Sequence, residues 1–283
     1  MAHAPAESTV AEPTVRHFAD LPQRLLSALI LAPIALLCLW LGGAAWVVLA
    51  TLAGIAMGVE WAKVCRFLPV SPPAVLLPVL VAAACLASAA GFAFAALAVL
   101  FLVGVVLAAG SGGGTPARRW LAGGLLYLGL AAVATVWLRQ SGPAGLGNML
   151  FVVLIVWASD SGAYVVGRVF GGAKLAPRIS PSKTWAGALG GLAFAVAAGI
   201  LVAEGFAAGP SASVLLASVT LGVASQAGDL LESAFKRRFG VKHSGNLIPG
   251  HGGVLDRLDG VLAAAPAAAV LALVLGRGVE LWR

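Results

Sequence analysis

Long stretches without a single charged side chain constrain the fold of this chain more than any other feature. Residues 25–59 and 67–117 contain no Asp, Glu, Lys or Arg. A helix needs about 20 apolar residues to cross the hydrocarbon core of a bilayer, where lipid offers the backbone no hydrogen-bond partners. Each stretch is therefore long enough for two such helices. Only 10% of all residues are charged, against roughly a quarter in soluble domains, which excludes an ordinary soluble fold.

Nine membrane-spanning helices fit the sequence. The first stretch is broken at Gly42-Gly43 and the second around Ala90-Gly91, which gives four spans. Five further spans are predicted at residues 120–138, 145–164, 185–203, 211–230 and 260–275. We therefore predict an all-α fold, a polytopic integral membrane helical bundle of about nine transmembrane helices.

The distribution of Lys and Arg tests this topology, because these residues accumulate in cytoplasmic loops. With nine spans and a cytoplasmic N-terminus, only Arg139, Arg277 and Arg283 of the 18 Lys and Arg residues fall outside those loops. We expect a multi-pass protein of the inner (plasma) membrane with its active site facing the cytoplasm. Three regions are predicted: a flexible cytoplasmic tail (1–22), a transmembrane scaffold of about five spans (23–140) and a catalytic transmembrane domain of about four spans (141–283).

Charge and small residues bear on possible partners. The net charge of +7 suits nucleic acid, anionic lipid headgroups or a phosphorylated substrate, and the hydropathy decides against nucleic acid. Small residues on the seventh span permit close helix packing, and they allow a homodimer without requiring one. Those residues are Gly187, Gly190, Gly191 and Ala195.

A polar segment follows the eighth span. If it is helical, Asp229, Glu232, Ser233 and Lys236 lie at positions i, i+3, i+4 and i+7, so that all four share one face. A solvated helix end at the membrane interface would also carry such charges. The choice between the two interpretations depends on the neighbouring segments.

A second acidic pair leads into the ninth span. Asp256 and Asp259 are one helical turn apart, and carboxylates in or near the membrane are costly and typical of functional sites. Carboxylate oxygens without Cys or His clusters suit magnesium, which is usually held by one or two carboxylates plus substrate phosphates. The preceding Gly252 and Gly253 would let the backbone approach a phosphate.

The segment between the sixth and seventh spans carries cations and hydroxyl groups. Its cations are expected in any cytoplasmic loop, but Ser180-Pro-Ser182-Lys183-Thr184 is more specific. A rigid turn with two hydroxyls, a lysine and a helix N-terminus is a plausible phosphate site. Acidic metal ligands beside cations on one membrane face favour phosphoryl or nucleotidyl transfer, and the apolar bundle indicates a lipid co-substrate.

These segments resemble the phosphatidate cytidylyltransferase family. The first similar stretch reads Gln226-x-Gly228-Asp229-Leu230-x-Glu232-Ser233-x-Phe235-Lys236-Arg237, and the second reads Lys242-x-x-Gly245-x-x-Ile248-Pro249-x-His251-Gly252-Gly253-Val254-x-Asp256-Arg257-Leu258-Asp259. Further similar stretches are Asp160-x-x-Ala163-Tyr164-x-x-Gly167-Arg168 and Ile179-Ser180-Pro181-x-Lys183-Thr184-Trp185-x-Gly187. The chain departs from the family pattern at His243 and Ala186, where the family carries acidic residues.

The resemblance implies transfer of the CMP moiety of CTP to phosphatidate, which gives CDP-diacylglycerol and pyrophosphate in phospholipid biosynthesis. Magnesium is implied as the cofactor, and a second cation stays open. The metal ligands would come from Asp229, Asp256, Asp259, Glu232 and Asp160. The catalytic residues would be Asp229, Asp256, Lys236, Arg237, Lys183 and His251. Substrate would bind at Ser180, Ser182, Lys183, Thr184, Ser233, Lys236, Arg237, Lys242, Gly252, Gly253 and Arg257.

Two other functions stay open at this point. A CTP-dependent lipid (polyisoprenol) kinase could carry a similar CTP-handling segment, but it would release CDP rather than pyrophosphate. An ion-coupled transporter could use intramembrane Asp160 and Asp229. It would predict polar residues toward both membrane faces and a repeated half, and the sequence shows neither.

Overall fold

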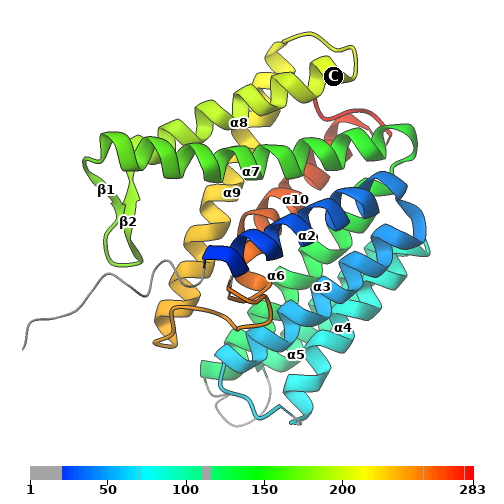
Figure 1. Cartoon of the computed structure of the whole chain (residues 1–283). Coiled ribbons are helices and arrows are strands. Elements are labelled where there is room, and N and C mark those ends of the chain that lie inside the picture. The colour runs from blue at the N-terminus through cyan, green and yellow to red at the C-terminus, as the bar shows by residue number, and fades with distance from the viewer. Residues whose placement is uncertain (1–20, 70, 110–115, 251, 277) are drawn as a thin grey trace, which may run out of the picture.

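The computed structural model describes residues 21–69, 71–109, 116–250, 252–276 and 278–283. Within these residues the chain forms nine α-helices, one short 3-10 helix and one two-stranded hairpin (Figure 1). The helices are α2 (Leu21–Leu41), α3 (Gly43–Val64), α4 (Pro72–Ala89), α5 (Ala93–Ala109), α6 (Pro116–Arg139), α7 (Gly145–Phe170), α8 (Trp185–Gly205), α9 (Ala212–Arg238) and α10 (Leu255–Leu275). The hairpin consists of β1 (Lys174–Ala176) and β2 (Ser180–Thr184), and η1 (Gly142–Ala144) precedes α7.

The nine helices fall on the nine predicted spans, and both predicted breaks are present. Gly42, Gly43 and Gly91 have φ angles of 63°, 48° and 92°, a backbone region that glycine enters without steric cost. In the described part of the chain, seven helices are long and apolar enough to cross a membrane, and the apolar helices Leu29–Leu41 and Ala93–Ala109 are shorter. The predicted all-α polytopic membrane fold is confirmed.

Three helices extend at least five residues beyond one end of the predicted spans. α7 continues to Phe170, α9 continues to Arg238, and α10 already begins at Leu255. Hydropathy marks the hydrocarbon core, whereas helical hydrogen bonding continues into the polar boundary. The carboxylates predicted near α9 and α10 therefore lie on the helices themselves, and the helix backbone fixes their positions.

The segment Ser180–Thr184 was predicted as a rigid turn, and this prediction was wrong. It forms strand β2, antiparallel to β1, with Lys174 opposite Thr184 and Ala176 opposite Ser180. The predicted helix N-terminus is present, because Thr184 is the N-cap of α8. Its Oγ1 accepts a hydrogen bond from the backbone N–H of Gly187 at 3.1 Å, which satisfies one of the donors that a helix start leaves unpaired.

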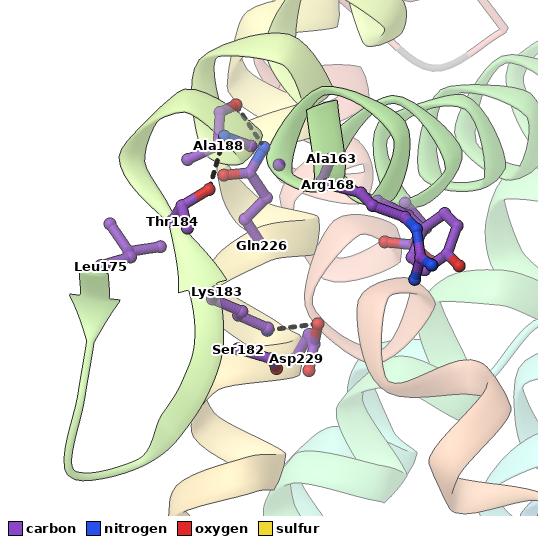
Figure 2. A pocket seen from close by; sticks show the side chains of 13 residues that line it. Ala163, Arg168, Leu175, Ser182, Lys183, Thr184, Ala188, Gln226 and Asp229 are labelled. Atoms are coloured by element: carbon purple, nitrogen blue, oxygen red, sulfur yellow. Dashed lines mark hydrogen bonds and ion pairs between the residues drawn. The ribbon is translucent and has the colours of Figure 1, made fainter. Parts of the chain in front are cut away.

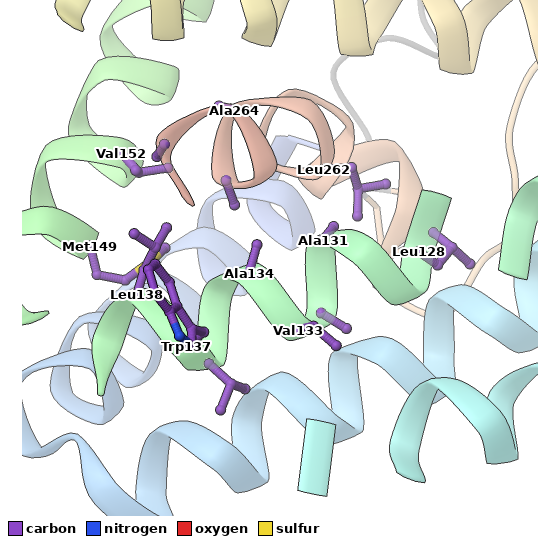
Figure 3. Close-up of a cluster of buried hydrophobic side chains, with 14 of the residues drawn as sticks. Leu128, Ala131, Val133, Ala134, Trp137, Leu138, Met149, Val152, Leu262 and Ala264 are labelled. Carbon is purple, nitrogen blue, oxygen red and sulfur yellow. The ribbon is translucent and has the colours of Figure 1, made fainter. Parts of the chain in front are cut away.

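The helix α6 lies at the centre of the bundle and contacts α3, α4, α5, α7 and α10. Leu128 and Ala131 on α6 lie in a buried apolar cluster with Leu262 and Ala264 of α10 and with Met149 of α7 (Figure 3). Helices of the N-terminal and C-terminal halves therefore share one core, which holds the site-bearing helices in place.

Small residues bring α7 and α8 close together, as predicted for the seventh span. A Cβ atom at Gly187 would lie 2.8 Å from the carbonyl oxygen of Ala163, and one at Gly190 would lie 2.5 Å from Cγ2 of Val166. Ala195, further along α8, is fully buried. Lipid tails are as apolar as the side chains, so close van der Waals packing of this kind has to hold the helices together.

Two adjacent glycines of α6 provide a test of this packing. A Cβ atom at Gly124 would lie 2.5 Å from Cδ1 of Trp61, whereas one at Gly123 would have no atom within 4 Å. Trp61 is itself stacked on Phe235 of α9, with ring centroids 3.7 Å apart. Because overpacking costs about 1–3 kcal/mol, we expect Gly124→Ala to lower the melting temperature of the detergent-purified protein by several degrees. Gly123→Ala should melt no lower than wild type, and equal destabilisation of both variants would contradict this packing.

Candidate active site

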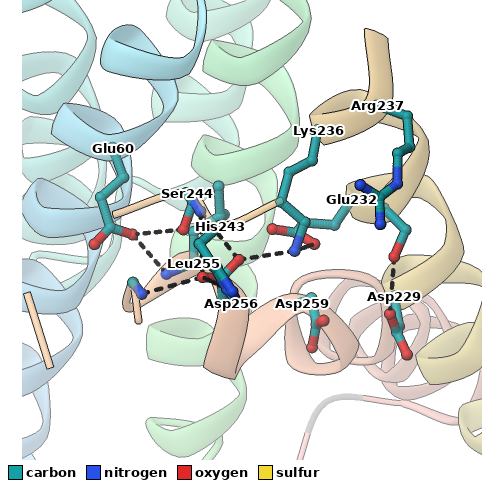
Figure 4. A network of polar contacts seen from close by, with 12 residues as sticks. Glu60, Asp229, Glu232, Lys236, Arg237, His243, Ser244, Leu255, Asp256 and Asp259 are labelled. Carbon is teal, nitrogen blue, oxygen red and sulfur yellow. Dashed lines mark hydrogen bonds and ion pairs between the residues drawn. The ribbon is translucent and has the colours of Figure 1, made fainter. Parts of the chain in front are cut away.

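Lys236 on α9 lies between two carboxylates (Figure 4). Its Nζ is 2.5 Å from Oε2 of Glu232, one turn earlier on the same helix, and 2.8 Å from Oδ1 of Asp256 on α10. The side chains of Glu232 and Asp256 are 0% and 5% exposed. Buried charges are tolerated only when they are paired, so Lys236 is what lets both carboxylates lie inside the protein.

Asp256 is oriented by two backbone N–H groups and has a histidine close by. The backbone N–H of Ser244 donates to both carboxylate oxygens at 3.2 Å, and the N–H of Gly253 donates to Oδ2 at 3.1 Å. Gly252 has φ +86°, and a Cβ there would lie 2.9 Å from the same oxygen. Nδ1 of His243, at the position where the family carries an acidic residue, is 3.7 Å from Oδ2. The glycines of this segment therefore let the backbone close around Asp256.

Glu60 on α3 is a site residue that the sequence predictions missed. Its side chain is fully buried and accepts hydrogen bonds from the N–H groups of Val254 (3.0 Å) and Leu255 (2.8 Å). It also accepts from the hydroxyl of Ser244 at 3.2 Å. Two backbone N–H groups at the start of α10 thus find their acceptor on α3, in the N-terminal half of the chain. A lone Glu at the end of an apolar span was the only available signal, because its partners lie 184 to 195 residues away.

A polar cavity of about 410 Å³ opens between α7, the hairpin, α8 and α9 (Figure 2). Asp160, Tyr164 and Arg168 line it from α7, Ser182 and Lys183 from β2, and Asp229 from α9. An ion pair joins Lys183 to Asp229, and both side chains are partly exposed, at 25% and 30%. The cavity therefore brings carboxylates, hydroxyls and cations from three separate segments together.

The predicted acidic ligands fall into two groups. Asp160 and Asp229 line the cavity, and Asp259 on α10 is within electrostatic reach of both. Asp256 and Glu232 instead share Lys236. Among the described residues, no three His, Cys, Asp or Glu side chains are close enough to hold a metal by themselves. Because magnesium usually takes one or two carboxylates and completes its shell with substrate phosphates, Asp160 and Asp229 fit an ion that binds together with a nucleotide.

The remaining predicted residues lie around these two groups. The hydroxyl of Ser233 donates to Oδ1 of Asp229 at 3.4 Å. Nε of Arg237 donates to the carbonyl of Ile179 at 3.3 Å and so fastens the hairpin to α9. Lys242 and Arg257 are exposed. His251, predicted as catalytic, lies outside the described residues.

The fold and the site define a class of protein: a polytopic membrane protein in which carboxylates and cations meet at the ends of apolar helices. A profile of the cytidylyltransferase family matches residues 22–275, which is nearly the whole chain. The chain therefore belongs to the cytidylyltransferase family.

Curated relatives refine this assignment. A phosphatidate cytidylyltransferase of Brucella suis is 40% identical over 256 residues, which cover 87% of this chain and 91% of the relative. The phosphatidate cytidylyltransferase of Pseudomonas aeruginosa is 39% identical over 273 residues, covering 91% and 99%. That of Bacillus subtilis is 42% identical over 142 residues, covering 50% of this chain and 53% of the relative. The similarity thus includes the scaffold helices, where the sequence motifs alone had indicated none.

The buried ion pairs of Lys236 lead to a prediction about stability. Lys236→Met leaves Glu232 and Asp256 buried without their cation, and breaking a buried pair on one side costs about 3–5 kcal/mol. We expect this variant to melt well below wild type in detergent. In the double variant Glu232→Gln/Lys236→Met, part of the loss should be recovered, because the side chain at position 232 is then uncharged, while Asp256 keeps only its backbone donors. Equal melting temperatures of the single and the double variant would show that Glu232 does not depend on Lys236.

The contacts of Glu60 lead to a second prediction. Glu60→Ala leaves two N–H groups and one hydroxyl without their acceptor, and each unsatisfied buried group costs about 1–3 kcal/mol. We expect a loss of both thermal stability and activity, and a smaller loss in Glu60→Gln, which keeps one acceptor oxygen. Glu204→Ala, at an exposed position at the far end of α8, is the matched control. If Glu60→Ala behaved like Glu204→Ala, Glu60 would not hold the start of α10.

Proposed function

We propose that this protein transfers the CMP moiety of CTP to phosphatidate and so produces CDP-diacylglycerol and pyrophosphate. The observation that carries the proposal is the polar cavity, whose lining combines Asp160 and Asp229 with Arg168 and Lys183 at the end of a largely apolar bundle. Such a site suits reactions between phosphates, where positioning and neutralisation of charge do most of the work. The two full-length relatives carry the same activity in their names.

The orientation in the membrane is part of this proposal. The cavity lies at the end of α7 that carries Arg168, next to the hairpin with Lys174 and Arg178 and to the basic end of α9. Because Lys and Arg accumulate on the cytoplasmic side, this end would face the cytoplasm, where CTP is available. The protein would then lie in the inner membrane and receive its lipid substrate from the cytoplasmic leaflet.

The reaction needs no covalent enzyme intermediate. An oxygen of the phosphatidate phosphate attacks the α-phosphorus of CTP, and the bond from that phosphorus to the bridging oxygen of the β-phosphate breaks. Pyrophosphate leaves with the electron pair. Magnesium, when bound, would supply neutralisation of the triphosphate charge, and Asp160 and Asp229 would hold it.

Side chains of this protein would then bind the phosphates and supply hydrogen bonds and positive charge. Lys183 and Arg168 would bind phosphate oxygens at the cavity. Ser182 and Ser233, on either side of the Lys183–Asp229 pair, would donate hydrogen bonds. Lys236 lies between buried carboxylates and would contribute positive charge from a fixed position. The roles of Asp256 as a metal ligand and of His251 as a catalytic group stay predictions.

Asp229→Asn tests the proposed role of this carboxylate. The amide keeps an acceptor for Ser233 but loses the negative charge, so we expect activity to fall at least a hundredfold while the melting temperature changes little. Activity is measured with purified protein in detergent, phosphatidate, magnesium and labelled CTP. Glu280→Gln, in a surface pair with Arg283, serves as the control and should retain activity. Undiminished CTP-dependent activity in Asp229→Asn would refute the proposed role.

Product identification tests the reaction itself. With CTP labelled in the cytidine, a cytidylyltransferase incorporates the label into the lipid product and releases pyrophosphate. Transfer of the terminal phosphate would leave the label in free CDP and no nucleotide in the lipid. The second outcome would overturn the proposed function.

A further inference from the structure

A second cavity lies on the apolar side of the same helices. It has a volume of about 690 Å³ and is an open groove between the end of α2, α7 and α8. Trp40 of α2, Leu154 of α7 and Ala198 of α8 line it, and Ser161 supplies the one polar side chain of its lining. No part of the proposed chemistry uses this groove. Its lining belongs to helices that are long or apolar enough to lie in the membrane, where the surrounding medium is hydrocarbon.

The groove and the polar cavity follow one another along α7. Leu150, Leu154 and Ser161 line the groove, and Tyr164 and Arg168 line the polar cavity. These residues are spaced three, four or seven positions apart along the helix, so they share one face. One face of α7 therefore carries residues of both cavities, those of the apolar groove nearer its start and those of the polar cavity nearer its end.

The groove is longer than one leaflet of the bilayer is thick. From Leu146 to Ser161 the groove covers sixteen residues of α7, a length of about 22 Å at 1.5 Å per step. One leaflet of the hydrocarbon core is roughly 15 Å thick. A tail that starts at the level of Ser161 can thus lie along the groove for the full depth of a leaflet.

We propose that this groove binds an acyl chain of the lipid substrate while its phosphate occupies the polar cavity. The inference rests on the proposed function. An amphipathic molecule with an anionic head and a hydrocarbon tail matches a cavity that holds Arg168 and Lys183 and an apolar groove that lies along the same two helices. In lipid the groove gains little from hydrophobic transfer, because the tail only exchanges one apolar environment for another. Its effect is to orient the phosphate, and long-chain substrates benefit from it while short-chain substrates do not.

Two adjacent alanines of α8 give the matched test. Ala198 lines the groove, whereas Ala197 does not line it and is exposed. A tryptophan at position 198 fills the groove, and one at position 197 faces outward. Activity is measured with dioleoyl phosphatidate and with dihexanoyl phosphatidate, whose chains are too short to occupy the groove.

A misplacement of reacting groups by about 1 Å can cost up to a hundredfold in rate, so we expect kcat/KM of Ala198→Trp for dioleoyl phosphatidate to fall roughly tenfold. Its kcat/KM for dihexanoyl phosphatidate should stay at the wild-type value. Ala197→Trp should match wild type with both substrates. An equal fall with both substrates, or no fall with either, overturns the groove as an acyl-chain site. If wild-type protein converts neither lipid, the proposed function itself fails, and this outcome is visible before any variant is compared.

A measurement on wild-type protein covers the case in which Ala198→Trp does not fold. Phosphatidate with a photoreactive diazirine at the end of one acyl chain is crosslinked in detergent, and the labelled peptides are identified by mass spectrometry. Label is expected on residues 146–158 and 198–206 and should decrease when unlabelled phosphatidate is added. Label that avoids both segments, or that unlabelled phosphatidate does not displace, overturns the proposal.

Discussion

The structure depends on one constraint: a charged side chain inside an apolar bundle must find its partner within the protein, because lipid supplies none. Around α10 this constraint is met in two ways. Lys236 holds Glu232 and Asp256 by charge, and Glu60 holds backbone N–H groups at the start of the helix. Together these contacts connect α3, α9 and α10, so the position of the acidic residues is fixed by the scaffold as well as by the helices that carry them.

The sequence predicted the architecture well for a physical reason. Uncharged stretches of sufficient length have one stable arrangement in a bilayer, and the glycines at 42, 43 and 91 mark where the chain reverses. The acidic and basic residues on α9 were also predicted on one face, and the ion pair of Glu232 with Lys236 agrees with that spacing. Both predictions depend on local pattern alone, which explains why they needed no knowledge of tertiary contacts.

What the sequence could not predict depends on contacts between distant segments. In the sequence, Glu60 is only a charged residue at the end of a membrane span. Its contacts with the start of α10 become visible only in the structure. The hairpin was taken for a turn because Ser180 to Thr184 contains Pro and hydroxyl residues, which are typical of both. The sequence analysis treated the predicted carboxylates as one metal site. In the structure, α9 packs against α10 so that Asp256 forms an ion pair with Lys236, whereas Asp229 lines the cavity together with Asp160.

The two lysines of the site differ in a way that bears on catalysis. The side chains of Lys183 and Asp229 are 25% and 30% exposed at the cavity, so an incoming phosphate can reach Lys183 and replace the carboxylate as its partner. Lys236, by contrast, is enclosed by buried carboxylates that need its charge. We infer that a substrate phosphate replaces Asp229 as the partner of Lys183, whereas Lys236 keeps its carboxylate partners. Asp229 would then be free of Lys183 and could hold a cation that the nucleotide phosphates also bind.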